Sequence, residues 1–457
     1  MNKKRSAFSG KIGYVLSAAG ASVGLGNIWR FPYLAAKYGG GIFLLVYIIL
    51  ALTFGYTMIV AESALGRMTR KSPVGAFRSF AKGKKVGWLS FGGWINAIIP
   101  VLIVPYYSVI GGWVVKYLFE YIRGNGSKLA EDGYFSGFIS SGEATEICFV
   151  IFCMFTLVII YAGVQNGIER VSKIMMPILI VLSVIIAIYS VTRPGAIEGV
   201  KYFLVPNVKN FSWMTVVAAM GQMFYSLSIA MGILVTFGSY MRKDTSIEDS
   251  TRNVEIFDTA IAMMAGLMII PAVFAFSGGD PDTLQAGPSL MFITIPKVFA
   301  NMGFGTAVGI LFFVLVLFAA VTSSIALTES AVSTFEDELG WGRKKATVLT
   351  GVIMIALGTL SCLGYGPLDF VKIIGMQFLD FFDFLTNSVM MPIAALMTSL
   401  LVSRVIGVDK IEEEIRHGES AFRRKKIFVV MIKYLCPIFA LIILASSVAN
   451  AFGWIVM

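Results

Sequence analysis

Long runs of apolar residues, separated by short polar connections, make up most of this 457-residue chain. A helix that crosses a bilayer needs about 20 apolar residues, because all its backbone groups must bond internally in lipid. Runs of roughly that length or longer occur eleven times, so the pattern predicts an all-α polytopic membrane protein. The predicted spans are 12–36, 42–66, 88–119, 146–163, 171–191, 212–240, 254–277, 305–335, 346–363, 373–402 and 428–456.

The first predicted span is interrupted within GASVGLGNIWRFP, the stretch that begins at Gly20. Gly20, Gly24 and Gly26 fall within seven residues, and each glycine costs a helix about 1 kcal/mol relative to alanine. Close packing of helices through small residues is the alternative explanation. Asn27 and Arg30 favour an unwound segment that faces a cavity, because polar and charged side chains inside a membrane are costly and usually functional.

A second interruption is predicted in the sixth span, where Ser226, Ser228 and Gly232 follow one another closely. Serines that bond back to helix carbonyls are the alternative explanation. Five spans precede this one and none precedes the first, so the broken spans occupy corresponding positions in two inverted five-span halves. Such a pair points to a binding site near the membrane midplane. The predicted divisions are 1–195 for the first five-helix repeat, 196–405 for the second, inverted repeat with an outer loop at 278–304, and 406–457 for a cytoplasmic connection and an eleventh helix.

The net charge of +10 lies mainly in particular connections. Basic residues gather in the N-terminal arm and after the second span, whereas the next connection is mostly acidic. The positive-inside rule therefore places the N-terminus in the cytoplasm, and an odd number of spans leaves the C-terminus outside a plasma membrane. The charge thus indicates topology rather than nucleic-acid binding. The basic residues in question are Lys3, Lys4, Arg5 and Lys11 in the arm, and Arg67, Arg70, Lys71, Arg78, Lys82, Lys84 and Lys85 after the second span.

Two further features add little chemistry. The connection at 278–304 has an apolar, helical middle that is too short and too interrupted by proline to span a membrane. It is expected either to cover a central site as a lid or to lie along the surface. The four cysteines show neither metal-ligand spacing nor a disulfide framework, so they are interpreted as small buried residues.

Three segments carry a resemblance to a known family. They read GLGNIWRFPYLAAKYGGGIFLLVYII from Gly24, GQMFYSLS from Gly221 and AAVTSSIALTES from Ala319. With them the chain resembles the neurotransmitter:sodium symporters over essentially all eleven spans, and in particular a bacterial eleven-span branch similar to the leucine, tyrosine and hydrophobic amino acid transporters. The resemblance implies sodium-coupled uptake of an amino acid, two Na⁺ ions, and neither an organic cofactor nor an obligatory protein partner.

The resemblance also implies two sodium sites. Sodium is a hard cation that prefers several oxygen ligands, and the carbonyls of a broken helix supply them without burying net charge. A ligand that completes the shell of an ion also couples the two binding events. The first site is expected at Ser22, Asn27, Ser226 and Asp258, and the second at Gly20, Val23, Ala319, Thr322 and Ser323.

The resemblance also implies a bound amino acid, whose ammonium group would face oxygens near Ala21, Phe224, Tyr225 and Ser228 and whose carboxylate would accept a hydrogen bond from Tyr107. Its carboxylate would meet the amides of Leu25 and Gly26, where a half-helix N-terminus favours an anion. The methyl of Ala230, where the family often has glycine, is expected to shrink the pocket, whereas Met231 is adaptable. The sequence is therefore compatible both with small aliphatic and with large aromatic substrates. The implied substrate residues are Ala21, Leu25, Gly26, Ile103, Tyr107, Phe224, Tyr225, Ser228, Met231, Ser323 and Leu327.

Asp258 departs from the family pattern, which commonly has a sodium-binding asparagine there. Chloride-dependent members have a serine about one turn later and chloride-independent members a carboxylate nearby, but this chain has Ala262, or Ile261 if the register slips by one. Asp258 is expected to act both as sodium ligand and as compensating charge, which predicts chloride independence. The alternative places Asp258 at the cytoplasmic interface as a solvated acid.

Two gates complete the resemblance. Arg30 and Asp383 would pair above the site, with Tyr225 as a lid. Arg5 and Asp337 would pair below it near Tyr240, with Phe8 replacing a family tryptophan and loosening the N-terminal latch. Glu329, where several relatives carry a neutral side chain, raises a proton-coupling hypothesis. Alternating access needs ion pairs that form in one conformational state and break in the other, and both gates are expected to be pairs of this kind.

The sequence as a whole therefore predicts a symporter that imports a neutral, hydrophobic amino acid by rocking spans 1, 2, 6 and 7 against the rest. A receptor of the same fold that binds without transporting, and a sodium-coupled transporter of an amine or osmolyte, are the alternatives. An enzyme is disfavoured, because the spans contain no acid, base or metal set of catalytic spacing apart from Asp258 and Glu329.

Overall fold

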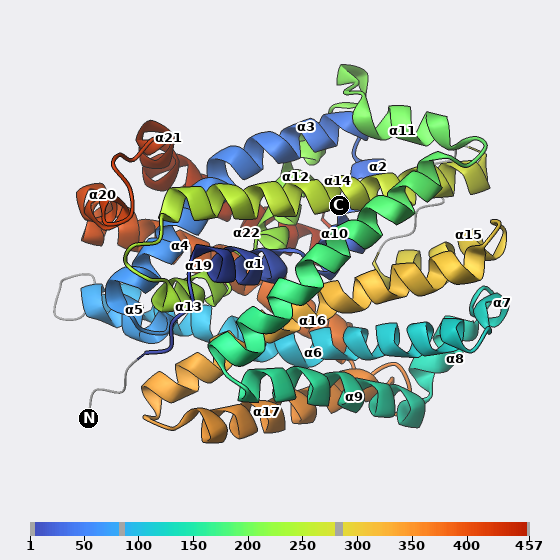
Figure 1. Ribbon diagram of the computed structural model, residues 1–457, viewed down its shortest axis with the longest axis horizontal. Helices are drawn as coiled ribbons and strands as arrows, with labels where there is room; N and C mark the ends of the chain where they lie inside the picture. The colour runs from blue at the N-terminus through green and yellow to red at the C-terminus, as the bar shows by residue number, and fades with distance from the viewer. Residues whose placement is uncertain (1–4, 82–86, 279–286, 455–457) are drawn as a thin grey trace.

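The computed structural model describes residues 5–81, 87–278 and 287–454, and it is helical almost throughout (Figure 1). Nine helices within those residues are long and apolar enough to cross a membrane. Each coincides with one of the predicted spans, which confirms an all-helical, multi-pass membrane protein. They are Gly41–Thr69, Gly87–Ile122, Gly142–Tyr161, Val164–Val191, Ile247–Ser277, Gly305–Glu338, Arg343–Leu363, Phe378–Ile406 and Lys425–Ala451.

The two predicted spans missing from that set are the ones expected to be broken. The first consists of α1 (Lys11–Ser22), a π-helical turn (Gly26–Arg30) and α2 (Phe31–Lys37). The sixth consists of α12 (Trp213–Ser226) and α13 (Ile233–Tyr240). None of these pieces reaches the length of about 20 residues that a membrane crossing needs.

The first break begins where α1 ends and Val23 adopts an extended conformation, with φ −78° and ψ 94°. Gly24 then passes close to the eighth span: a Cβ at Gly24 would lie 2.6 Å from Ser323 Oγ and 3.2 Å from Tyr107 Oη. Both explanations of the glycines therefore hold, because the backbone is unwound and small residues also permit its close approach.

The second break has a different cause. Ser228, Ala230 and Gly232 all have positive φ values, of 53°, 59° and 70°. A right-handed helix cannot continue through left-handed residues, so the chain turns between α12 and α13. Before this turn α12 begins with a reciprocal cap, in which Ser212 Oγ accepts from the Thr215 amide and Thr215 Oγ1 accepts from the Ser212 amide.

The remaining spans are built from longer helices and short connecting ones. Several change between α- and π-helical geometry along their length. Their α-helices are α3 (Gly41–Leu50), α4 (Tyr56–Thr69), α6 (Ser90–Ile122), α9 (Gly142–Tyr161), α10 (Arg170–Val191), α14 (Ile247–Ser277), α16 (Gly305–Glu338), α17 (Arg343–Leu363), α18 (Phe378–Asp383), α19 (Met391–Leu400), α21 (Lys425–Val430) and α22 (Cys436–Ala451). The connecting helices are α5 (Pro73–Ala81), α7 (Gly126–Leu129), α8 (Tyr134–Ser140), α11 (Ala196–Leu204), α15 (Ile295–Ala300) and α20 (Val408–Arg416).

The broken helices lie inside the bundle. Helix α1 packs against α10, α14 and α16, while α13 packs against α4 and α12 against α3. The spans run lengthwise in Figure 1, with α5 and α20 at one end and α7, α8 and α15 at the other. We name these the α20 end and the α15 end. The two breaks therefore fall at the centre of the molecule, surrounded by intact spans.

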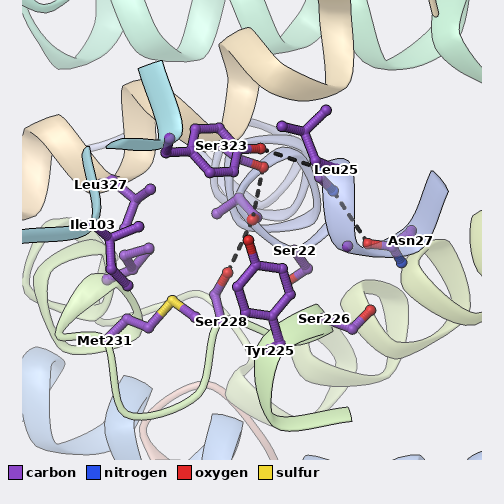
Figure 2. A pocket seen from close by; sticks show the side chains of 15 residues that line it. Ser22, Leu25, Asn27, Ile103, Tyr225, Ser226, Ser228, Met231, Ser323 and Leu327 are labelled. Carbon is purple, nitrogen blue, oxygen red and sulfur yellow. Dashed lines mark hydrogen bonds between the residues drawn. The ribbon is translucent and has the colours of Figure 1, made fainter. Parts of the chain in front are cut away.

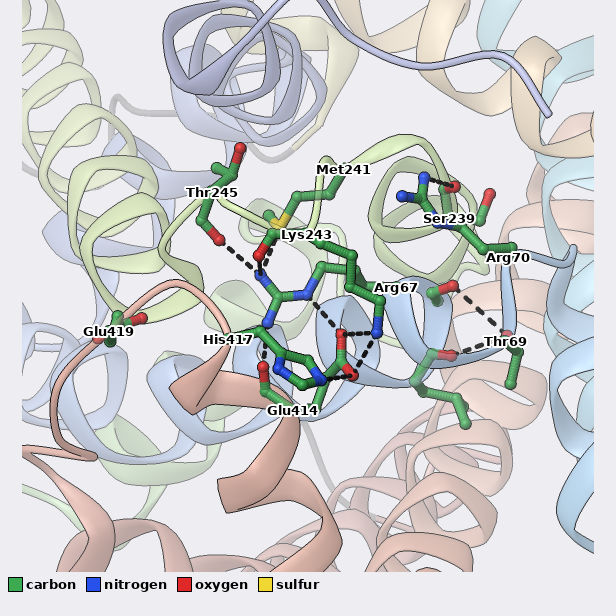
Figure 3. A network of polar contacts seen from close by, with 12 residues as sticks. Arg67, Thr69, Arg70, Ser239, Met241, Lys243, Thr245, Glu414, His417 and Glu419 are labelled. Carbon is green, nitrogen blue, oxygen red and sulfur yellow. Dashed lines mark hydrogen bonds and ion pairs between the residues drawn. The ribbon is translucent and has the colours of Figure 1, made fainter. Parts of the chain in front are cut away.

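Helix α20 is fastened to its end of the bundle by a buried ion pair (Figure 3). Arg67, at the end of α4, donates from Nε to Glu414 Oε1 at 2.7 Å and from Nη1 to the Thr245 carbonyl at 2.5 Å. Lys243 Nζ lies 2.9 Å from Glu414 Oε2. The Arg67 side chain is completely buried. The connection between the tenth and eleventh spans is thus attached to the second span and to the loop that precedes α14.

The connection at 278–304 is described from residue 287 onward. Its helical middle, predicted from sequence, covers residues 290–300 and packs into the α15 end rather than along the surface. Phe292 is fully buried, and its carbonyl accepts a hydrogen bond from Tyr117 Oη at 2.8 Å. Residues 279–286 of the predicted connection lie outside the part of the chain that the structure describes. So do Lys3, Lys4, Lys82, Lys84 and Lys85, on which part of the predicted topology depends.

Candidate functional site

A cavity lies between the two breaks (Figure 2). Its free volume is about 30 Å³, so its walls are close together in this conformation. Figure 2 shows the side chains of Ile103, Leu327 and Met231 on one side of the view and Asn27 and Ser226 on the other. The lining comes from four spans and consists of Ala21, Ser22, Gly24, Leu25, Gly26, Asn27, Ile103, Tyr107, Tyr225, Ser226, Ser228, Met231, Ile233, Ser323 and Leu327.

Asp258 stands behind the polar side of the cavity. It is fully buried, so the alternative of a solvated acid at the membrane interface is wrong. Its Oδ1 accepts hydrogen bonds from Asn27 Nδ2 at 2.8 Å and Ser226 Oγ at 2.7 Å, and its Oδ2 accepts one from Tyr47 Oη at 2.6 Å. Asn27 Oδ1 accepts the Gly24 amide at 3.2 Å. Three of the four residues predicted for a first sodium site, Asn27, Ser226 and Asp258, thus form one hydrogen-bonded cluster. The fourth, Ser22, lines the same cavity.

The residues predicted for a second sodium site also lie together. Ser323 Oγ is 3.3 Å from the Gly20 carbonyl and 3.4 Å from the Val23 carbonyl. Thr322 Oγ1 lies 3.2 Å from the Ala319 carbonyl, and a Cβ at Gly20 would lie 3.1 Å from Thr322 Cβ. Backbone carbonyls of the first span therefore face two hydroxyls of the eighth, which is an oxygen-rich arrangement suited to a hard monovalent cation.

The amide of Leu25 and the hydroxyl of Tyr107 meet at one side of the cavity, where Leu25 donates to Tyr107 Oη at 3.3 Å. Next to them the Gly26 carbonyl accepts from Gln222 Nε2 at 3.0 Å. Glycine is required at position 26, because a Cβ there would lie 2.4 Å from the ring of Tyr225. Two of the three predicted carboxylate-binding groups, the Leu25 amide and the Tyr107 hydroxyl, are thus close enough to contact one anion.

The oxygens predicted to meet an ammonium group are partly engaged with one another. Ser228 Oγ donates to the Ala21 carbonyl at 2.9 Å. The Tyr225 carbonyl accepts the Ser228 amide, and the Phe224 carbonyl accepts the Ile229 amide, each at 3.3 Å. The Phe224 ring packs against Phe54, with ring centroids 5.1 Å apart. Phe224 therefore offers only its backbone to the site.

The apolar side contains Ile103, Met231 and Leu327, as predicted, and also Ile233, which sequence reasoning missed. Ala230 was expected to narrow the pocket with its methyl group. Its contribution is instead through the backbone, since its amide donates to Glu62 Oε1 at 2.9 Å while Met231 and Ile233 form the wall. The side chains of Met231 and Ile233, rather than the methyl group of Ala230, therefore limit the pocket on this side.

The predicted outer gate is open in this structure. Arg30 and Asp383 line a second cavity of about 390 Å³ at the α15 side of the first, and the described residues include no ion pair between them. Asp383 Oδ1 instead accepts from Asn387 Nδ2 at 2.6 Å and Tyr106 Oη at 3.2 Å. The Arg30 guanidinium lies 5.5 Å from the ring centroid of Tyr225. Tyr225 borders both cavities and so separates them, as expected of a lid.

The predicted inner gate is closed. Arg5 Nη1 lies 2.5 Å from Asp337 Oδ1, and Asp337 Oδ2 accepts the Ser72 amide at 2.6 Å. Arg5 also donates to Ser239 and Ser333 and stacks 5.0 Å from the ring centroid of Tyr240. The gate therefore joins the N-terminal segment to the connection between the second and third spans, to α13 and to α16.

Phe8 packs beside this gate, while the expected loosening relative to a tryptophan stays a prediction. Its side chain is buried, with its ring against Tyr14, Phe237 and Tyr240, and its amide donates to the Tyr240 carbonyl at 3.1 Å. Burial of an aromatic ring in contact with three others stabilises the segment that carries it. A phenylalanine is thus sufficient to hold the N-terminal segment here.

Glu329 has a structural partner that the sequence did not reveal. Arg343 donates to both of its carboxylate oxygens, at 3.0 and 2.6 Å, and Tyr240 Oη donates to Oε1 at 2.7 Å. A bidentate guanidinium compensates the buried negative charge. This carboxylate therefore ties α16 to α17 and to the inner gate, while its proposed part in proton coupling stays a prediction.

Several polar residues of the site were missed. They are Tyr47 at Asp258, Gln222 at the Gly26 carbonyl, Glu62 at the Ala230 amide, and Tyr106 and Asn387 at Asp383. Glu62 carried a signal, because a carboxylate within an apolar span is costly and usually functional. Tyrosine, glutamine and asparagine within apolar spans give a weaker signal, since many such residues only bond a neighbouring helix.

The model of the Sodium:neurotransmitter symporter family matches residues 5–127 and 134–453. An uncharacterized sodium-dependent transporter, YhdH of Bacillus subtilis (strain 168), is 34% identical over 96% of this chain and 97% of its own. A second, from Haemophilus influenzae, is 32% identical over 98% and 99%. The crystal structure of MhsT in complex with L-phenylalanine superposes with a TM-score of 0.86 at 36% identity, covering 97% of this chain and all of that one.

Proposed function

The chain belongs to the Sodium:neurotransmitter symporter family, and from that premise we propose that it imports a neutral, hydrophobic amino acid together with Na⁺. The family makes it a sodium-dependent membrane transporter rather than an enzyme. The observation that carries the substrate class is the two-sided cavity, which has backbone amides, carbonyls and hydroxyls on one side and aliphatic side chains on the other. The fold of MhsT, crystallised with L-phenylalanine, supports the same class.

In this proposal two sodium ions occupy the two oxygen clusters. The first ion binds the Ser22 carbonyl together with Asn27, Ser226 and Asp258. The second ion binds carbonyls of the first and eighth spans together with the hydroxyls of Thr322 and Ser323. Each ion joins a broken span to an intact one, so sodium binding would stabilise the assembled cavity.

The amino acid would bind between the ions. Its carboxylate replaces the present contact between the Leu25 amide and Tyr107 Oη, and also meets the Gly26 amide at the start of the π-helical turn. Its ammonium faces the carbonyls of Ala21 and of the segment after α12, together with Ser228. Its side chain displaces Met231, which is flexible enough to adapt to its size.

Chloride independence follows from the position of Asp258 in this proposal. Its carboxylate supplies a fixed negative charge within the cluster of Tyr47, Ser226 and Asn27. A bound anion would be repelled by that carboxylate, because two like charges in a buried site are mutually destabilising. Ala262, one helical turn later, offers neither a hydroxyl nor a charge.

The architecture supports alternating access. We infer eleven spans arranged as two inverted five-helix repeats, 1–195 and 196–405, followed by a connection and an eleventh helix, in a plasma membrane with the N-terminus cytoplasmic and the C-terminus outside. The α20 end is then the cytoplasmic end. Spans 1, 2, 6 and 7 would rock against the others, closing the Arg30–Asp383 gate while the Arg5–Asp337 gate opens.

The decisive experiment is uptake of labelled phenylalanine into proteoliposomes under an inward sodium gradient. We expect accumulation above the external concentration, abolished when choline replaces sodium and unchanged when gluconate replaces chloride. Binding without accumulation would instead identify a receptor. A strict chloride requirement would contradict the role assigned to Asp258.

A competition panel identifies the substrate class. The common amino acids, and several amines and osmolytes, are added in excess against labelled phenylalanine. Hydrophobic amino acids should compete best, because the far wall offers no partner for a charged or strongly polar side chain. Stronger competition by an amine without a carboxylate would favour the alternative transporter class.

Proton coupling is tested separately with Glu329→Gln. The substitution keeps a hydrogen-bonding group but removes the charge that pairs with Arg343. If Glu329 carries a coupled proton, the pH dependence of uptake should flatten. An unchanged pH profile would remove the hypothesis and leave the residue with a structural role.

A further inference from the structure

An apolar groove follows the outside of the bundle between α9 and α17, which lie side by side in Figure 1. Its volume is about 410 Å³. Gly351 forms part of its floor, and a Cβ at that position would lie 2.9 Å from Leu157 Cδ1. The side chains along its walls are Leu157, Val158, Tyr161, Thr347, Val348, Val352 and Ile355.

Thr347 is an exception within this apolar lining. Its side chain is almost completely buried, at 4% exposed, and its Oγ1 has no hydrogen-bond partner among the described residues. The other buried hydroxyls on the same helix, those of Thr350 and Ser361, donate to the carbonyls of Ala346 at 2.9 Å and of Leu357 at 3.4 Å. A buried hydroxyl without a partner is costly, and Thr347 belongs to the lining of the groove, so a ligand group that accepts a hydrogen bond from it would remove that cost.

Positive charge gathers where the groove reaches the α20 end. Helix α17 begins there with three consecutive basic residues, Arg343, Lys344 and Lys345. Arg343 points into the bundle toward Glu329 and the Ile160 carbonyl. Lys344 and Lys345 are exposed, and Lys344 Nζ lies 5.6 Å from the ring centroid of Tyr161, at the mouth of the groove. The amides of the first turn of α17 add their own attraction for an anion.

These features follow one another in the order of the parts of a phospholipid. The lysines and the helix N-terminus lie at headgroup level. Thr347 lies one turn deeper, about 6 Å along the helix axis from Arg343, which is where the ester carbonyls lie beneath a phosphate. Val348, Gly351 and Val352 then continue as an apolar channel for an acyl chain.

We propose that the groove between α9 and α17 binds one anionic glycerophospholipid, with its phosphate at Lys344 and Lys345, an ester carbonyl at Thr347 and an acyl chain over Gly351. Basic pockets between membrane helices commonly recognise acidic headgroups. The occupied groove joins α9 to the start of α17, next to the Arg343–Glu329 pair that reaches the inner gate. This proposal does not depend on the identity of the transported substrate.

Native mass spectrometry of the full chain in detergent tests the proposal. Phosphatidylglycerol and phosphatidylcholine with identical acyl chains are titrated separately, and adducts are counted. We expect phosphatidylglycerol to bind in a one-to-one complex more tightly than phosphatidylcholine. Replacing both lysines, Lys344→Gln with Lys345→Gln, should weaken phosphatidylglycerol binding about tenfold and erase the preference.

A matched control removes two exposed lysines elsewhere at the same end, Lys410→Gln with Lys426→Gln, and should leave binding unchanged. Val352→Trp fills the groove from its exposed wall and should displace both lipids, while Thr347→Val should weaken binding about threefold by removing one hydrogen bond. Elution as a single species shows that each variant has folded.

Three results would overturn the proposal. The first is equal binding of the two lipids by the wild-type chain, and the second is wild-type affinity in the double-lysine variant. The third is a lipid-free dimer that Val352→Trp dissociates, because the groove would then be an interface between two copies.

Discussion

The two ends of the molecule are held in different ways. At the α20 end, buried or half-buried charges are paired across helices: Arg67 with Glu414, Arg5 with Asp337, and Arg343 with Glu329. At the α15 end, Arg30 and Asp383 face each other across an open cavity of about 390 Å³ without an ion pair. One end is therefore closed by charge and the other is open to the site.

In the proposed alternating-access cycle, this difference indicates which of the two gate movements costs more free energy. Breaking a buried pair is costly, because each charge is then left without a partner in a poorly solvated place. Closing the outer gate requires only that two groups already facing one cavity approach each other. In that cycle, opening the α20 end is therefore the more costly step, and it occurs only if ligands bind the resulting conformation more tightly.

The Arg67–Glu414 pair should show the largest effect. Arg67→Met leaves the buried Glu414 carboxylate without its main partner, and we expect the free energy of unfolding to fall by about 3 kcal/mol or more. Thermal unfolding in detergent measures this as a lower Tm. Lys243→Met removes the half-exposed partner of the same carboxylate and should cost less than about 1 kcal/mol. Equal losses in the two variants would contradict the distinction between buried and exposed charge.

The inner gate should show the next largest effect, on conformation rather than on folding. Arg5→Ala removes the bond to Asp337 and those to Ser239 and Ser333. We expect the α20 end to open, so that a cysteine introduced by Thr236→Cys, buried in this structure, reacts about tenfold faster with a water-soluble maleimide. Arg5→Lys keeps the positive charge, so its maleimide reactivity should lie between that of the wild-type chain and that of Arg5→Ala. Unchanged reactivity would show that the aromatic contacts of Phe8 are enough to close this end.

The outer gate should show the smallest effect. Asp383→Asn keeps the shape of the side chain but removes its attraction for Arg30. Because the pair is not formed in the open state, substrate binding should stay within about twofold, whereas the uptake rate should fall several-fold as closure weakens. The matched control is Asp380→Asn. Asp380 lines the same cavity and accepts a hydrogen bond from Tyr365, and its substitution should change neither substrate binding nor the uptake rate. A large loss of binding in Asp383→Asn would mean that its charge acts on the substrate directly.

The sequence already located the site. The glycines and Asn27 of the first span and the serines of the sixth predicted two breaks, and both are present. The family resemblance then selected residues that the structure brings together, including Asp258 with Asn27 and Ser226. These predictions succeeded because glycines and polar groups within an apolar span are local features, readable from the chain itself.

Contacts between distant spans could not be read in this way. Tyr47 and Gln222 belong to the site because packing places them beside Asp258 and Gly26, and Ala230 acts through its amide because Glu62 happens to face it. A pattern along the chain states that a polar residue needs a partner, but not which residue provides it.

The sequence by itself determined the spans, the two breaks, the family and the apolar character of the cavity, because each depends on residue type and spacing. Only the tertiary structure decided that the inner gate is closed while the outer gate is open, that Glu329 pairs with Arg343, and that α20 is fastened to Arg67. Those outcomes depend on which side chains meet across spans and on which of two packings the bundle adopts, and neither is encoded in any one segment.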